Sequence, residues 1–320
     1  WLLITDSSLT GTQDIVLDFL PGISTSRLGN APVEILRTKD LTNPFFQILV
    51  RSFLRGADSQ RVLVNSFHGL EAGAVEALRA KNVKMTPIGP TFGVGHNKSN
   101  PSLLDEAQSK CLQWLDKQAP KSVVYVAFGL AGFLSGEEIR ELAAALEAFG
   151  KPFLWAIRDG SATESLPASI RSGNLPTEKG LIVSWAPQRH VLGHGSVGAF
   201  VSHCGWNSML ESIWNGVPVV GCPRVAEQNT NMWLAQEWGI GVAGVDTMMG
   251  GKGSLRSATL IQALQHVMGT PGMDTDNELC RVNLKKKVAE VAAAAHTAVS
   301  PTGTSTQAFQ AFVKDLLEKC

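Results

Sequence analysis

The sequence has no excess of charge of either sign. Its 320 residues carry 28 Lys and Arg against 28 Asp and Glu, which gives a formal net charge of zero. Nucleic acids and anionic membrane surfaces attract proteins through a basic field, which this composition does not supply. We therefore expect no nucleic acid and no membrane among its partners, and expect a small molecule or a protein instead.

Cysteine is scarce and scattered. The five cysteines form an odd set without a C-x-x-C pair: Cys111, Cys204, Cys222, Cys280 and Cys320. This spacing indicates neither a disulfide framework nor a zinc knuckle. A reducing compartment, the cytoplasm, fits the pattern best.

Long apolar runs and the marks of a secretion signal are also lacking. No run reaches the roughly 18 apolar residues that a membrane-spanning helix needs. The chain opens on Trp1, without an initiator Met or the charged n-region of a signal peptide. The sequence leaves open whether Trp1 is the natural start.

The later part of the chain alternates between apolar strands and helical patterns. At about 150 residues per domain, its length predicts two domains. The strand candidates after residue 120 are 123–128, 153–157, 181–185, 199–202 and 218–222. Apolar strands that alternate with helices predict a parallel sheet covered on both faces, a doubly wound α/β domain.

The first hundred residues are less complete. They offer three strand candidates, at 2–5, 62–65 and 83–88, whereas sheets usually have about four to six strands. We place a partial first domain with a polar linker at 1–108 and a second domain at 109–320. The last helix, at about 306–319, is expected to pack back on the first domain.

One polar turn stands out, the H-C-G-W-N-S segment that follows the strand candidate at 199–202 and opens a helix. Ligands bind beyond the carboxyl ends of parallel strands, and a helix start offers free N–H groups to an anion. Gly205 would let the backbone approach a phosphate, while His203, Asn207 and Ser208 could donate hydrogen bonds. The alternative is an ordinary helix capped by Asn207 or Ser208, with His203 satisfied in the core.

The pattern around this turn extends over 44 residues, from Trp185 to Gln228, and reads W-A-P-Q, V-L-x-H, H-C-G-W-N-S-x-x-E, G-V-P and E-Q. It resembles the signature box of plant family 1 UDP-glycosyltransferases. VVYVAFG, NSFHGLEAGAVEAL and FLPGI also resemble landmarks of that family. The resemblance implies a GT-B fold of two Rossmann-like parallel-sheet domains, here with a truncated N-terminal acceptor-binding domain and a C-terminal domain that binds a UDP-sugar.

The resemblance also implies roles for individual residues. Trp185 would stack on uracil while the backbone of Ala186 reads its edge. Gln188 would contact the ribose region, and the Glu211 carboxylate would accept hydrogen bonds from the ribose hydroxyls. Taken singly, Trp185 could be a core residue, Gln188 a cap and Glu211 a surface charge.

The resemblance assigns the other residues of the box to the diphosphate and to the sugar of the donor. Those implied to hold the diphosphate are His203, Asn207 and Ser208, beside Gly205. Those implied to face the sugar are Trp206, Glu227 and Gln228, and a terminal Gln is typical of glucose users. The resemblance thus implies inverting transfer of glucose from a UDP-sugar to a hydroxyl of a small lipophilic acceptor, by a monomer without metal or another cofactor.

The chain departs from the family pattern in four places. The first His is His68, which does not match the catalytic base. Asp6 would match the Asp that orients that base, but FLPGI follows almost at once, which indicates that a stretch of strand and helix is missing there. Leu130 replaces a phosphate-contacting hydroxyl, and Glu227 stands where Asp is usual. We therefore expect the chain to be inactive alone, and two alternatives stay open: a catalytically silent UDP-sugar-binding protein and an incomplete gene product.

Two further patterns carry less weight. The segment 239–244, GIGVAG, matches G-x-G-x-x-G but follows a helical pattern, so it fails as a dinucleotide fingerprint. His190 and His194 could share a helix face near His203, yet no Glu accompanies them as in H-E-x-x-H. We expect no metal site.

Overall fold

The computed structural model describes residues 16–17, 26–27, 44, 47–48, 51, 55–56, 58–93, 106–129, 134–157, 164–171, 179–246, 254–270 and 274–318. The chain divides into two compact units. The first combines Trp1–Lys98 with Glu290–Cys320, and the second is Ser99–Ala289. The domain limit at residue 108 stays a prediction.

The second unit is built on one six-stranded sheet with neighbours in the order β10-β9-β8-β5-β6-β7. The strands are β5 (Val123–Ala127), β6 (Phe153–Ala156), β7 (Gly180–Val183), β8 (Val197–Ser202), β9 (Val219–Gly221) and β10 (Gly241–Ala243). Every neighbouring pair is parallel. The predicted doubly wound fold is confirmed.

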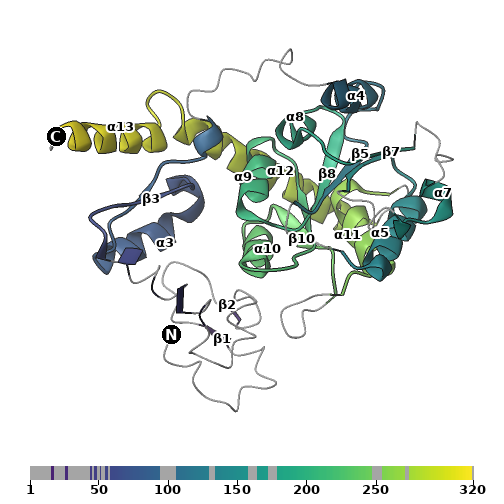
Figure 1. The fold of residues 1–320 in the computed structure, drawn as a ribbon, viewed down its shortest axis with the longest axis horizontal. Coiled ribbons are helices and arrows are strands. Elements are labelled where there is room, and N and C mark those ends of the chain that lie inside the picture. The colour runs from purple at the N-terminus through teal and green to yellow at the C-terminus, as the bar shows by residue number, and fades with distance from the viewer. Residues whose placement is uncertain are drawn as a thin grey trace. The chain divides into compact units, whose positions relative to one another are not determined.

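Helices cover both faces of this sheet (Figure 1). They are α4 (Glu106–Leu115), α5 (Gly136–Phe149), α7 (Ala168–Arg171), α8 (Gln188–Leu192), α9 (Trp206–Trp214), α10 (Gln228–Glu237), α11 (Ser257–Met268) and the start of α12 (Thr275–Ala298). Helices α5 and α11 pack together, while α8 touches both α4 and α9, and α9 touches α10. Two-sided cover explains why every residue of β5 and β8 is buried.

The start of α5 is fixed by its sequence. The Ser135 hydroxyl accepts from the backbone N–H of Glu138 at 3.3 Å, and the Glu138 carboxylate accepts from the N–H of Ser135 at 2.8 Å. This is the capping box predicted by the Ser-x-x-Glu spacing. Ile139, Leu142 and Leu146 then form the buried stripe of the helix.

The segment 239–244 contains a strand that sequence analysis missed. Gly241–Ala243 forms β10 at the edge of the sheet, paired with β9. The segment does follow a helix, α10, so its rejection as a dinucleotide fingerprint stands. A three-residue strand among glycines gives too short an apolar run to be recognised.

The first unit holds a parallel pair of strands, β3 (Val62–Val64) and β4 (Met85–Pro87), joined through α3 (His68–Ala80). Two of the three expected strands are thus confirmed, and the one expected at 2–5 lies outside the described residues. A short antiparallel pair, β1 (Val16–Leu17) and β2 (Ser26–Arg27), and a 3-10 turn, Thr91–Gly93, complete the described elements before residue 100.

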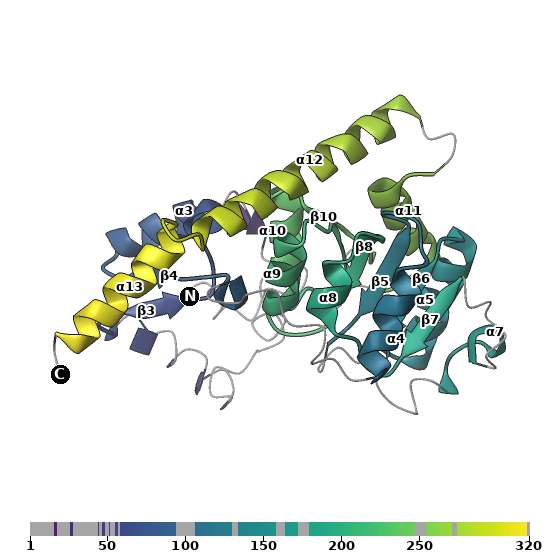
Figure 2. The same ribbon diagram turned by 90° about the horizontal axis from the view of Figure 1, so that it is seen from above.

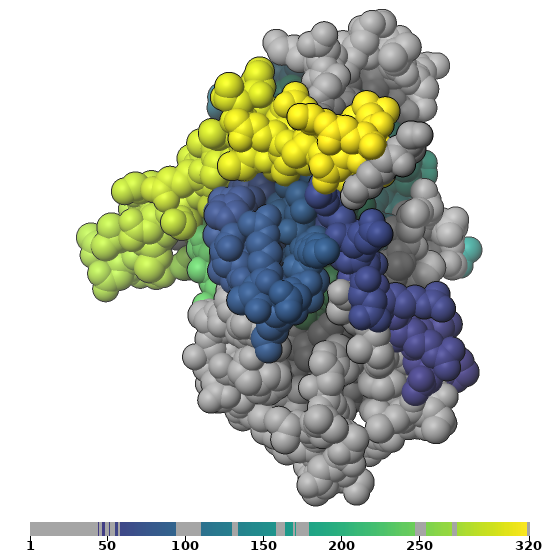
Figure 3. Space-filling model, turned by 90° about the vertical axis from the view of Figure 1, so that its left-hand side faces the viewer, coloured from purple at the N-terminus to yellow at the C-terminus, as the bar shows by residue number. Residues whose placement is uncertain are grey.

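The last helix, α13 (Thr304–Leu317), packs within the first unit, beside β4 (Figure 2) and over residues 60–93 (Figure 3). The Ser305 hydroxyl donates to the carbonyl oxygen of Gly89 at 2.7 Å. Arg61 forms an ion pair with Asp315 at 2.5 Å. In the described parts of the chain, no helix combines the length and the apolar character needed to cross a membrane.

Candidate functional site

The sheet of the second unit has a topological switch point between β5 and β8. From β5 the chain continues outward through β6 and β7, and from β8 it continues in the opposite direction through β9 and β10. Helices that cross to opposite faces leave a crevice beyond the carboxyl ends of these two central strands. The polar turn after β8 lies at this crevice.

His203 follows the last residue of β8 and packs against two glycines. A Cβ on Gly129, which follows β5 closely, would lie 2.8 Å from Nε2 of His203. A Cβ on Gly205 would lie 2.6 Å from the same atom. Gly205 therefore makes room for the imidazole, a role that sequence analysis did not assign to it.

One ring nitrogen of His203 has no hydrogen-bond partner among the described residues. The residue is 9% exposed, and its Nδ1 atom is buried without a hydrogen-bond partner among the residues described. Burial lowers the pKa of His203, and the backbone of Ala127 opposes that shift. The unpartnered nitrogen of this imidazole can form one hydrogen bond with a ligand at the switch point.

Helix α9 begins beside His203 without a side-chain cap. Its first residue is Trp206 and its N-cap is Gly205, where no side chain accepts from the first turn. The alternative of a cap by Asn207 or Ser208 is wrong, because the helix begins before either residue and Gly205 has no side-chain oxygen. The first-turn N–H groups and the positive end of the helix dipole thus remain available to an anion.

The side chains of the first turn of α9 differ in exposure. Asn207 is exposed and Ser208 is buried. The Ser208 hydroxyl oxygen accepts from Nε2 of Gln188 at 2.9 Å. Its proton can therefore be donated to a ligand oxygen.

Gln188 gathers residues from three elements into one network. It is the first residue of α8, and its Nε2 also donates to the Glu211 carboxylate at 2.8 Å. The hydroxyl of Tyr125 in β5 donates to Oε1 of Gln188 at 3.3 Å. The structure thus brings together Gln188, Ser208 and Glu211, the first of them 20 and 23 residues before the other two.

Burial sets the electrostatics of this network. It raises the pKa of Glu211, while the hydrogen bond from Gln188 and the charge of Arg189 lower it. Burial also raises the pKa of Tyr125, and the nearby Glu211 carboxylate adds to that rise. Tyr125 therefore stays a neutral donor to Gln188, which fixes the orientation of the amide.

Trp185 and Ala186 follow β7, at the same edge of the sheet. Trp185 is 48% exposed, whereas Ala186 is buried. The reading of Trp185 as a core residue is therefore wrong. An indole with an exposed face is suited to stack on a planar ring.

Trp206 and Glu227 lie close to the turn but have other contacts. The Trp206 ring packs edge to face on Trp238, with centroids 6.2 Å apart. Glu227 is exposed, and its Oε1 accepts from Nδ2 of Asn231 at 3.5 Å. That both face a sugar stays a prediction.

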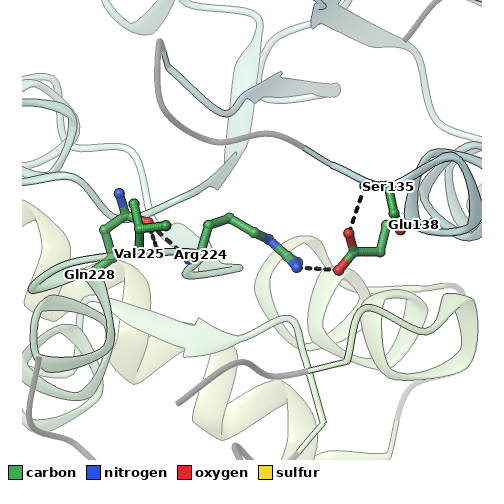
Figure 4. A network of polar contacts seen from close by, with 5 residues as sticks. All are labelled: Ser135, Glu138, Arg224, Val225 and Gln228. Carbon is green, nitrogen blue, oxygen red and sulfur yellow. Dashed lines mark hydrogen bonds and ion pairs between the residues drawn. The ribbon is translucent and has the colours of Figure 1, made fainter. Parts of the chain in front are cut away.

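Gln228 is 5% exposed, and its side chain stabilises the loop after β9 (Figure 4). Its Oε1 accepts from the backbone N–H groups of Arg224 and Val225, at 2.8 and 3.1 Å. The guanidinium of Arg224 forms a buried ion pair with Glu138. Sequence analysis missed this pair, since no local pattern relates residues 86 positions apart.

Two residues singled out from the sequence lie outside the described part of the chain: Asp6 and Leu130. His194, considered as a metal ligand, has protein partners. Its Nδ1 lies 2.8 Å from the Ser196 hydroxyl and its Nε2 lies 3.1 Å from an oxygen of Asp116. The contact with Asp116 joins the segment after α8 to the segment after α4.

Residues 104–277 match the family described as UDP-glucoronosyl and UDP-glucosyl transferase. The chain is similar to an anthocyanidin 3-O-galactosyltransferase of Actinidia chinensis var. chinensis, with 35% identity over 95% of this chain. It is also similar to a myricetin 3-O-rhamnosyltransferase of Crocosmia x crocosmiiflora, with 33% identity over 97% of this chain.

The structure resembles that of UGT2 of Phytolacca americana complexed with UDP-2fluoro-glucose and pterostilbene. The TM-score is 0.79 at 31% identity, over 98% of this chain and 65% of that one. The chain spans 62% and 64% of the lengths of the two curated relatives. The likeness therefore covers nearly all of this chain and less than two thirds of each relative.

Proposed function

Because the chain belongs to the family of UDP-glucoronosyl and UDP-glucosyl transferases, we propose that its second unit binds a UDP-sugar at the carboxyl edge of the sheet. The reaction is inverting transfer of the sugar to a hydroxyl group of a small lipophilic acceptor. Flavonoid acceptors in the names of two relatives support this acceptor class. A cytoplasmic location and a monomeric state belong to the same proposal.

The observation that carries the proposal is the buried Nδ1 of His203, unpartnered among the described residues, beside the uncapped start of α9. A diphosphate at this position receives hydrogen bonds from the imidazole, from the first-turn N–H groups and from Ser208. The same groups stabilise the negative charge that grows on departing UDP. Asn207, exposed on the first turn, is a further donor.

The nucleoside of the donor binds between Trp185 and the Gln188 network. The exposed indole of Trp185 stacks on uracil, and the backbone of Ala186 reads the edge of the base. The Glu211 carboxylate accepts from the ribose hydroxyls, and Gln188 holds Glu211 in place. Tyr125 in turn fixes the amide of Gln188.

We propose glucose as the sugar, with Glu227, Gln228 and Trp206 at its end of the site. Gln228 acts through its amide nitrogen, since its oxygen accepts from the backbone of the loop. Relatives named for galactose and rhamnose transfer show that the family accepts other sugars. The acceptor hydroxyl needs a general base, which contributes about 10²- to 10⁴-fold in rate, and Asp6 is the residue proposed to orient it.

A second candidate is a protein that binds UDP-sugar without turnover. His68 is the first His of the sequence, and its Nε2 lies 3.4 Å from a carboxylate oxygen of Glu76 on the same helix. His68 does not match the position of the family's catalytic His, so it is not proposed as the acceptor's base. Binding without catalysis would follow if no other residue supplied one.

Two measurements test the proposal. Calorimetry with UDP tests the donor site, and a transfer assay with radiolabelled UDP-glucose and a set of flavonols tests turnover. We expect UDP to bind. Binding without transfer to any acceptor supports the second candidate, and the absence of UDP binding contradicts both.

A further inference from the structure

Arg224 is a buried cation at the carboxyl edge of the sheet. It follows β9 and is 3% exposed. One guanidinium nitrogen, Nη1, pairs with the carboxylate of Glu138 in the first turn of α5 (Figure 4). The guanidinium carbon lies 5.9 Å from the centre of the Phe128 ring, directly after β5.

The other two guanidinium nitrogens have no partner among the described residues. Nε and Nη2 of Arg224 are buried, and neither has an acceptor among the residues described. These two nitrogens lie on the same edge of the planar group, where their N–H bonds point in parallel. This edge fits two oxygens of one carboxylate or one phosphate.

Two acceptor side chains beside Arg224, Glu138 and Gln228, already receive hydrogen bonds. Glu138 accepts from Nη1 of Arg224 with one oxygen and from the backbone of Ser135 with the other. The side-chain oxygen of Gln228 accepts from two backbone N–H groups. Glu138 thus balances the charge of Arg224, and the Nε–Nη2 edge is left without an acceptor among the described residues.

We propose that Arg224 is an oxyanion-binding residue of the donor site, whose Nε–Nη2 edge binds two oxygens of the donor. This inference rests on the proposed function. The loop that carries Arg224 leads to Glu227 and to Gln228, the first residue of α10, and both are proposed to lie at the sugar. Two groups of a UDP-sugar supply such oxygens there, namely the β-phosphate and the carboxylate of a uronic acid.

The test compares wild type with R224K by calorimetry, using UMP, UDP, UDP-glucose and UDP-glucuronate. Lysine keeps a cation opposite Glu138 but has no planar edge with two parallel donors. Loss of a hydrogen bond to a charged group predicts about a tenfold to a hundredfold weaker binding. The affinity for UMP should not change, because UMP has neither a β-phosphate nor a sugar carboxylate.

The pattern of loss identifies the source of the oxygens. Equal losses for UDP, UDP-glucose and UDP-glucuronate assign the edge to the β-phosphate. A loss confined to UDP-glucuronate assigns it to the sugar carboxylate. Wild-type affinity for all three in a folded R224K protein overturns the inference.

R256K is the matched control. Arg256 also forms an ion pair with a glutamate of the first turn of α5, Glu137, at 2.8 Å, but both side chains are exposed. R256K should bind all four nucleotides as wild type does. If thermal unfolding shows that R224K is not folded, R224Q replaces it, since glutamine can still donate to Glu138. Absence of UDP binding by wild type contradicts the proposed function itself, whereas unchanged binding by R224K contradicts only the role of Arg224.

Discussion

The side-chain amide of Asn231 donates a hydrogen bond to the main-chain carbonyl oxygen of Cys204 at 2.9 Å, from 27 residues further along the chain. Cys204 has a φ of 64°, in the left-handed region that non-glycine residues rarely adopt. Asn231 is 4% exposed in α10. Helix α10 thus stabilises the turn that presents His203 and the start of α9.

Replacing Asn231 should therefore affect both stability and nucleotide binding. N231A leaves the buried carbonyl of Cys204 without this donor, so we expect a loss of about 1 to 3 kcal/mol in the free energy of unfolding. UDP should bind more weakly because the turn is less constrained. Urea unfolding and calorimetry measure the two effects.

N215A is the control for this prediction. Asn215 also donates from its side chain to a helix carbonyl, that of Glu211 at 2.8 Å, but at the far end of α9. The N215A variant should be less stable than wild type but should keep the wild-type affinity for UDP. Equal losses of affinity in both variants would mean that general destabilisation, and not the turn, weakens binding.

Trp185→Ala should weaken UDP binding by about 1 to 3 kcal/mol, the range for stacking of a base on an aromatic side chain. Stability should change little, because the indole is 48% exposed. Calorimetry with UDP measures the affinity. Leu279→Ala, which shortens a side chain 59% exposed on α12, is the control that should leave it unchanged. Unchanged affinity for UDP in the Trp185 variant would show that Trp185 does not stack on uracil.

Glu211→Gln should reduce the preference for ribose over deoxyribose. The carboxylate is proposed to accept from the ribose hydroxyls, and a hydrogen bond to a charged group contributes about 1.5 to 3 kcal/mol. Wild type should therefore bind UDP more tightly than 2′-deoxy-UDP, and the variant should bind both with similar affinity. A preference that survives the substitution would place the ribose elsewhere.

The sequence predicted the central strands β5 and β8 well, because each is a continuous apolar run whose residues are all buried. It failed at β10, where glycines interrupt the run. The alternative that Asn207 or Ser208 caps the helix would also have placed the start of α9 too late. Local patterns reveal burial and caps, but an uncapped helix start next to a left-handed residue leaves no local pattern.

The site was only partly accessible to sequence reasoning. The resemblance placed Trp185, Gln188, Ser208 and Glu211 in one box, but the hydrogen bonds of Gln188 depend on the packing of α8 against α9. The sequence could not predict the hydrogen bonds that the Gln228 oxygen accepts or the ion pair of Arg224. The ion pair depends on how the loop after β9 meets α5, and the Gln228 contacts depend on the path of that loop itself.

His203 should make stability depend on pH. Its pKa in the folded chain lies below the ordinary value of 6.5, chiefly because of burial. Below about pH 6.5 the unfolded chain therefore binds more protons than the folded chain, so this residue's contribution to stability falls as pH falls through that window. Urea unfolding of wild type and His203→Gln at about pH 7.5, 6.5 and 5.5 measures the difference, and wild type should lose more stability toward low pH.

UDP should reverse the sign of this effect for binding. A diphosphate beside the ring favours the charged imidazolium, so the pKa of His203 should rise when UDP binds. Wild-type affinity should then increase, relative to His203→Gln, as the pH falls from about 7.5 to about 6.5, because binding takes up a proton. Titration of UDP itself affects both proteins alike and cancels in the comparison. Calorimetry in two buffers of different ionisation enthalpy counts the protons directly, and equal uptake by wild type and variant would mean that His203 does not contact the diphosphate.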